Sequence, residues 1–187
     1  MKDALIFLID TFTRLYLLIL LLRFWLPLVR ANFRNPVAQG VLRYTSPAVV
    51  PLRRFIPAIG KLDTATVIVA LLIQLLATLT IMLIIDGLEV LATLASSISS
   101  VIIAALLELA SLSVVMFIVA IALRVIFGFF GRYMGPLSDL LNDLTNPLLR
   151  PIQRIIPPLG VIDLSTYIVF ILLIALNMVL ADLKPVF

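Results

Sequence analysis

The chain has 187 residues, of which 63% are hydrophobic and only 13% are charged, and its mean hydropathy is +1.25. This composition leaves too little polar surface to solvate a compact domain in water, so it excludes an ordinary soluble protein. The absence of Cys and His removes the usual ligands of zinc, iron-sulfur clusters and haem, and we expect no metal, no cofactor and no enzyme activity. The net charge of +4 arises from basic residues that lie between apolar segments, which favours anionic lipid headgroups over nucleic acid as partners.

Four segments are long and apolar enough to cross a bilayer, namely residues 4–29, 65–85, 106–130 and 166–183. The first contains Asp10 and Arg14, whose spacing of one helical turn predicts an ion pair on one helix face. Gln74 in the second span and Asn177 in the fourth are further polar candidates at membrane depth. Such residues are often functional, but amides also bond across helices, and we favour helix packing for both.

The sequence repeats itself when it is shifted by 100 residues. Thr45-Ser46-Pro47 meets Thr145-Asn146-Pro147, and Arg23 meets Arg124 once a one-residue gap is allowed. The other matching residues of the first copy are Pro51, Arg54, Ile56, Pro57, Gly60, Asp63 and Thr66, each with an identical residue 100 positions later. We therefore predict an all-α membrane protein made of two helix-loop-helix units, residues 1–86 and 106–187.

Residues 87–105 connect the two units. Leu88, Leu91, Ala95, Ile98 and Ile102 form an apolar stripe opposite several hydroxyl side chains, which predicts an amphipathic or re-entrant helix. Because each unit crosses the membrane twice, both copies have the same direction and both long loops lie on one side. The loops and the adjoining helix ends carry most of the Lys and Arg, whereas the connection carries none. The positive-inside rule then predicts cytoplasmic loops and periplasmic termini.

Each long loop is predicted to hold two short helical pieces. The first begins at Pro36 or Pro136 and ends before the proline at 47 or 147, because a residue that precedes proline avoids the helical conformation. The second begins at Pro51 or Pro151, and its apolar side chains would lie in the interface.

Five charged residues near the ends of these loops are candidate lipid-binding or partner-binding residues. They are Arg53, Arg54, Arg154, Asp63 and Asp163. The two aspartates are placed to cap the following spans, and Arg54 and Arg154 are the expected partners of these carboxylates or of lipid phosphates. A purely structural role is the favoured interpretation, and a binding site is the alternative.

The proline, arginine, glycine and aspartate spacing of 45–63 and 145–163 resembles the YggT family of small membrane proteins, and the likeness spans nearly the whole chain. Asn35-Pro36 after the first span and Asp163-Leu164-Ser165 before the last also resemble the family pattern, whereas Gly135 and Asp63-Thr64-Ala65 depart from it. The resemblance implies a bacterial inner-membrane protein, with chloroplast relatives linked to cytochrome complex assembly and to nucleoid distribution, and bacterial ones linked to osmotic tolerance or division.

Two functions compete on this basis. The leading hypothesis is a non-enzymatic scaffold or assembly factor, whose partner is another membrane protein. The alternative is a transport or ion-homeostasis component that acts as an oligomer, because Asp10, Arg14 and Gln74 could line a path shared between copies. An enzyme is the weakest option, since the repeated aspartates have no metal-ligand cluster beside them.

Overall fold

The computed structural model describes residues 2–57, 60, 62–87, 90–129, 135–155 and 163–184. Six helices make up the fold within these residues: α1 Lys2–Leu28, α2 Pro36–Arg53, α3 Thr64–Asp86, α4 Val90–Phe129, α5 Pro136–Gln153 and α6 Leu164–Asp182. Within the same part of the chain, α1, α3, α4 and α6 contain the stretches that are long and apolar enough to cross a membrane. The prediction of an all-α, four-span membrane protein is thus confirmed.

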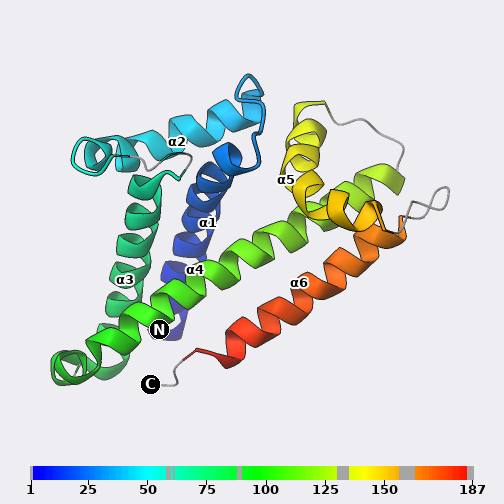
Figure 1. The fold of residues 1–187 in the computed structure, drawn as a ribbon. Helices are drawn as coiled ribbons and strands as arrows, with labels where there is room; N and C mark the ends of the chain where they lie inside the picture. The colour runs from blue at the N-terminus through cyan, green and yellow to red at the C-terminus, as the bar shows by residue number, and fades with distance from the viewer. Residues whose placement is uncertain are drawn as a thin grey trace.

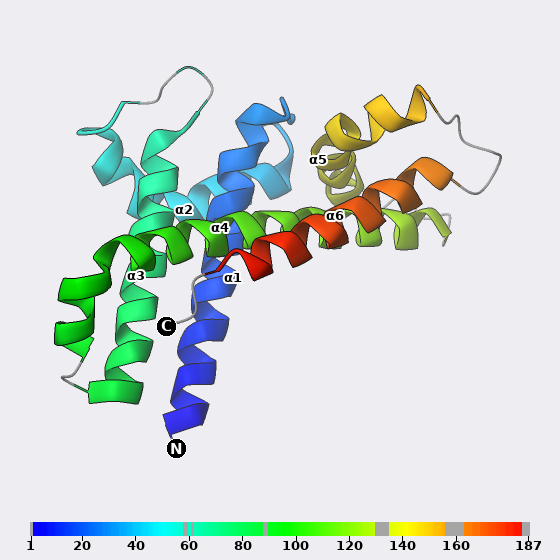
Figure 2. The same cartoon turned by 60° about the horizontal axis from the view of Figure 1, so that its bottom comes forward.

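The two repeats run in the same direction. Helix α1 leads to α2, which lies across its end, and α3 returns; α4, α5 and α6 then follow the same course (Figure 1). Both termini lie at the end of the molecule opposite α2 and α5 (Figure 1). The pair α4 and α6 crosses the pair α1 and α3 obliquely, as the second view shows (Figure 2). The predicted parallel repeat is therefore present, and it places both loop helices on one side.

The core lies where α1 meets the other spanning helices. Leu17, Leu20 and Leu21 of α1 are buried there, together with residues of α3, α4 and α6. Trp25 packs edge to face on Phe117 of α4, with ring centroids 4.9 Å apart, so an aromatic contact joins the two repeats. A second cluster, made of Leu26, Ala31, Ala38, Val41, Leu140 and Leu144, joins the starts of α2 and α5.

Each long loop contains one continuous helix, and the prediction of two short pieces in each is wrong. Helix α2 continues through Pro47 and Pro51, and α5 continues through the two equivalent prolines. All four prolines are exposed, so the carbonyls that lose their helical donors lie on the face that reaches water or headgroups. The hydroxyl of Thr45 also donates to the carbonyl of Val41 at 2.6 Å, which is the kind of bond that accompanies a bend in a helix.

The connecting segment is also more regular than expected. Helix α4 begins at Val90 and runs without interruption to Phe129, so the helix starts before the third span predicted at 106–130. The side chains of 88–97 lie outside the described residues, so the stripe is described only at its end. There Ile98 and Ile102 are exposed whereas Val101 and Ala105 are buried, so this end of the stripe faces outward.

Candidate functional site

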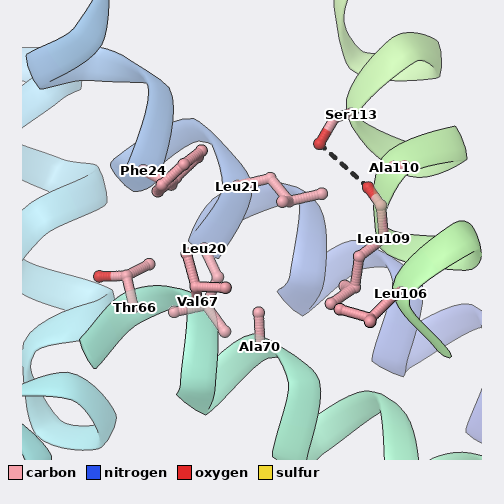
Figure 3. A pocket seen from close by; sticks show the side chains of 10 residues that line it. All are labelled: Leu20, Leu21, Phe24, Thr66, Val67, Ala70, Leu106, Leu109, Ala110 and Ser113. Atoms are coloured by element: carbon pink, nitrogen blue, oxygen red, sulfur yellow. Dashed lines mark hydrogen bonds between the residues drawn. The ribbon is translucent and has the colours of Figure 1, made fainter. Parts of the chain in front are cut away.

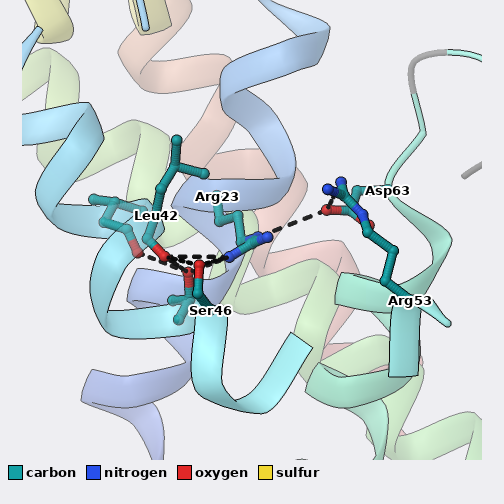
Figure 4. Close-up of polar contacts among 7 residues, drawn as sticks. Arg23, Leu42, Ser46, Arg53 and Asp63 are labelled. Carbon is teal, nitrogen blue, oxygen red and sulfur yellow. Dashed lines mark hydrogen bonds and ion pairs between the residues drawn. The ribbon is translucent and has the colours of Figure 1, made fainter. Parts of the chain in front are cut away.

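A buried arginine near the end of α1 holds α2 in place. Arg23 is 4% exposed, and its Nη1 donates to Thr45 Oγ1 at 2.9 Å and to Ser46 Oγ and the Leu42 carbonyl at 3.3 Å (Figure 4). On the other side, Nε of Arg23 lies 3.6 Å from Asp63 Oδ2, at the start of α3. One guanidinium thus connects all three helices of the first repeat. A charge that is this deeply buried persists only when it is paired and hydrogen-bonded, so the arrangement fixes α2 against the spans.

The second repeat contains the same contact. Arg124 of α4 donates through Nη1 to Thr145 Oγ1 at 2.6 Å and to Asn146 Oδ1 at 2.9 Å. Thr145 in turn donates to the carbonyl of Leu141, as Thr45 does one repeat earlier. Arg23 and Arg124 correspond in the sequence repeat, but the sequence predicted no role for them. The signal that could have revealed one is the matched spacing, since each arginine precedes its threonine by 21 or 22 residues.

The aspartates that precede α3 and α6 differ in their partners. Asp163 Oδ1 accepts from the Ser165 backbone N–H at 3.0 Å, so it caps α6 as predicted. Asp63 makes no such side-chain cap, and that part of the prediction is wrong. Its Oδ2 instead accepts from Arg53 Nη2 at 2.9 Å and lies near Arg23, which together draw the carboxylate away from the helix start.

The residue that contacts each aspartate lies one position before the arginine that was predicted to do so. Arg53 meets Asp63, and Gln153 donates through Nε2 to Asp163 Oδ2 at 2.9 Å, so Arg54 and Arg154 are not the partners of these carboxylates. The phase of the continuous loop helix explains the shift. Residues 45, 49 and 53 follow one another at intervals of four and share one helix face, of which the first two are fully buried.

The carboxyl of Asp163 is held in its charged form. Burial alone raises the pKa of this group. Hydrogen bonds from Thr166 Oγ1, Gln153 Nε2 and the N–H groups of Thr166 and Ser165 outweigh that effect, and together they hold the pKa of Asp163 below its ordinary value. In the first repeat, Asp63 Oδ1 and Thr66 Oγ1 are buried and have no hydrogen-bond partner among the described residues.

Arg54 and Arg154 lie just beyond the ends of α2 and α5, each followed by an exposed apolar residue. Phe55 is 86% exposed and Ile155 is 80% exposed. Neither arginine forms an ion pair with any carboxylate in the part of the chain that the structure describes. Each repeat therefore presents one arginine and one large apolar side chain, side by side in sequence, at the outer end of its loop helix.

The starts of α2 and α5 contact each other, so the two loop helices form one surface. Asn35 caps α2 by accepting from the Val37 N–H at 2.8 Å, and its Nδ2 donates to the carbonyl of Pro136 at 2.5 Å. The N–H of Asn32 donates to Asp143 Oδ2 at 3.0 Å. The equivalent of Asn35 is Gly135, whose φ of +58° is a conformation that favours glycine, and it supplies no side-chain cap.

The predicted ion pair within α1 is present, and it is part of a larger cluster. Arg14 Nε lies 2.9 Å from Asp10 Oδ1, and Arg14 Nη2 lies 3.4 Å from Glu108 Oε1 on α4. Lys184, just after α6, also pairs with Glu108. These four charges connect the two repeats near the middle of α1.

The two amides behave differently. Asn177 Oδ1 accepts from Ser111 Oγ at 2.7 Å, so this amide bonds across α4 and α6 as expected for helix packing. Gln74 donates to Thr78 on its own helix at 3.5 Å and to no other described residue, so the packing role between helices that was favoured for it is not seen. Over the described ranges, no three His, Cys, Asp or Glu side chains gather as a metal-ligand set.

The comparisons with known proteins agree with this geometry. A model of the CCB3/YggT family matches residues 2–84 and 99–183, which are the two repeats without the connection. The chain belongs to the CCB3/YggT family. It is 37% identical over 184 residues to an uncharacterized protein of Pseudomonas aeruginosa, covering 97% of this chain and 90% of that one.

Other relatives of this CCB3/YggT family protein extend over nearly the same length. An uncharacterized protein of Vibrio alginolyticus is 33% identical over 181 residues, covering 97% of this chain and 95% of that one. The Escherichia coli protein YggT is 32% identical over 180 residues, covering 96% and 90% of the two chains. No solved structure matches. The protein is thus a multi-pass membrane protein similar to bacterial YggT.

Proposed function

We propose that this protein is a non-enzymatic scaffold or assembly factor that holds another membrane protein against its paired loop helices. The observation that carries the proposal is the repeated exposed pair, Arg54 with Phe55 and Arg154 with Ile155. A guanidinium beside a large apolar side chain is typical of the residues that contribute most to protein interfaces. Because the two pairs are on the same side of the membrane, they can engage one partner together.

The orientation of the surface is part of the proposal. The side that carries α2 and α5 faces the cytoplasm, and both termini face the periplasm, because the basic residues are concentrated in the long loops. The remaining arginines of this side would contact the anionic headgroups of the same leaflet. Lipid contact alone is the competing explanation for the exposed pairs, since apolar and basic residues also anchor interfacial helices.

Photo-crosslinking in cells separates the two explanations. A photoreactive amino acid is placed at Phe55 or at Ile155, and at Phe7 as a control. Phe7 is 67% exposed and lies near the start of α1, whereas the loop helix α2 follows the end of α1. The proposal predicts that the first two positions capture the same membrane protein and that the control does not. Recovery of lipid adducts alone at both loop positions would refute it.

Transport or ion homeostasis by an oligomer is the second candidate function, and the charged cluster of Asp10, Arg14, Glu108 and Lys184 favours it. Charged groups near membrane depth often mark ion paths. Reconstitution of the purified protein in liposomes tests this candidate. An ion flux that is abolished by Asp10→Asn would favour transport, whereas no flux under any imposed gradient would leave the scaffold as the better account.

A further inference from the structure

The two repeats have a hollow at the same place. In the first, a cavity of about 150 Å³ lies between α1, α3 and α4 (Figure 3). In the second, a groove of about 600 Å³ lies between α4 and α6. Thr66, Val67 and Ala70 line the first, and the residues 100 positions later line the second. The α1 residues of the cavity likewise have their counterparts, 101 positions later, in the groove.

The first hollow is lined by a third helix and the second is not. Leu106, Leu109, Ala110 and Ser113 of α4 line the hollow of the first repeat beside α1 and α3 (Figure 3). Apart from Asp163, which immediately precedes α6, the groove of the second repeat is lined by α4 and α6 alone. No third described helix lines this groove, and it is partly open.

The arginine and the aspartate near each hollow are arranged differently in the two repeats. In the first repeat, Arg23 lies 3.6 Å from Asp63, and neither residue lines the hollow. In the second, Arg124 and Asp163 both line the groove, but they form no ion pair with each other. Asp163 is satisfied by Gln153 and its own helix start. The charge of Asp163 still acts on Arg124, but no described carboxylate lies within ion-pair distance of its guanidinium beside the apolar groove.

We propose that this groove binds a membrane phospholipid, with the phosphate on Arg124 and an acyl chain between α4 and α6. Arg124 lies five residues before the end of α4 at Phe129, which places it near the headgroup level. Its Nη1 already bonds to the second loop helix, so Nε and Nη2 remain to hold phosphate oxygens. Ile121, Val125 and Phe170 supply the apolar walls for the chain.

Native mass spectrometry of the purified full-length protein in detergent tests the proposal. Phosphatidylglycerol and phosphatidylethanolamine are compared with a diacylglycerol of the same chains, which lacks the phosphate. The protein should retain one phospholipid more tightly than the diacylglycerol, and Arg124→Gln should weaken phospholipid binding about tenfold to a hundredfold. Equal binding of the diacylglycerol, or unchanged phospholipid binding by Arg124→Gln, would overturn the proposal.

Two further variants separate binding from folding. A Cβ added at Gly128 meets no atom within 4 Å, so Gly128→Leu fits the helix, favours its formation and projects into the groove. It should lower phospholipid binding without lowering the melting temperature. Arg150→Gln, in the exposed part of α5, should leave binding unchanged, and an equal loss there would overturn the assignment to the groove. A lipid-free dimer that Gly128→Leu disrupts would instead identify a second copy of the chain as the occupant.

Discussion

Replacement of Arg23 by Gln tests whether one buried guanidinium holds the loop helix against the spans. The variant loses the 2.9 Å bond to Thr45 and two longer bonds at 3.3 Å, and it leaves Asp63 with only its second arginine. The matched control is Arg53→Gln, because glutamine is the natural residue at the equivalent position 153. There it donates to Asp163 at 2.9 Å, so the control can keep its hydrogen bond.

The expected magnitudes differ because the two arginines differ in burial. A buried hydrogen bond to a charged group contributes about 1.5 to 3 kcal/mol, and the removal of one member of a buried ion pair costs about 3 to 5 kcal/mol. Asp63 keeps its ion pair with Arg53, so we expect the lower end of the second range, and Arg23→Gln should lower the free energy of unfolding by about 3 kcal/mol. The Arg53 side chain is 50% exposed, and its replacement should cost about 1 kcal/mol or less.

The single tryptophan provides the assay. Trp25 is two residues from Arg23 and packs on Phe117, so its fluorescence reports the contact between α1 and α4. Reversible unfolding in mixed micelles, followed by this fluorescence and by far-ultraviolet circular dichroism, gives the free energy of unfolding for the protein and both variants. If the two variants agree within about 0.5 kcal/mol, the distinction between a buried and an exposed arginine is wrong.

Three further predictions concern polar groups in the second repeat. The pKa of Asp163 is lowered, so its carboxylate stabilises the fold above its ordinary pKa, and this contribution is lost as the pH falls through the lowered value. The free energy of unfolding, measured from about pH 7 to about pH 3, should therefore depend less on pH in Asp163→Asn than in the unaltered protein. An unchanged pH profile would contradict the assignment. Asn177→Leu should lower the free energy of unfolding by about 0.6 kcal/mol, because it removes the hydrogen bond from Ser111. Ser111→Ala should then lower it almost no further when both substitutions are combined, and fully additive losses would refute the hydrogen bond. Glu108→Gln removes two ion pairs, so it should lower the midpoint of thermal unfolding slightly at low salt and leave it unchanged at about 1 M salt. A decrease in the midpoint that is the same at both salt concentrations would rule out the ion pairs as its cause.

The repeat was visible in the sequence because the residues near its helix boundaries have the same spacing in both copies. Pro, Arg, Gly and Asp recur at a shift of 100, and these residues mark where helices begin and end whatever apolar residues lie between them. Two spans in each unit then require a parallel arrangement. The direction of the helices and the shared side of the loops followed from that count alone.

The contacts inside each loop were missed for a reason of helical phase. A separate helix that begins at Pro51 could rotate freely, whereas the continuous α2 fixes each residue relative to the buried Thr45 and Val49. Because adjacent helical residues differ by about 100° in direction, the contact falls on Arg53 and not on Arg54. The sequence rule about proline gave the wrong boundary because the prolines lie on the exposed face.

The packing of one repeat on the other was beyond the sequence. Both repeats have a hollow at the equivalent place, yet only the first is also lined by a helix of the other repeat. That difference depends on the oblique crossing of the two helix pairs, for which the hydrophobic pattern of a spanning helix contains almost no information. The groove of the second repeat and its Arg124 could therefore be found only from the structure.

The account depends most on the two loop helices sharing one side of the membrane. The chain has no Cys, so a cysteine placed at residue 54 or at residue 154 is the only thiol in its variant. Each variant is treated in sealed vesicles of known orientation with a thiol reagent that cannot cross the bilayer. Both positions should be labelled from the same side, whereas labelling from opposite sides would contradict the parallel repeat.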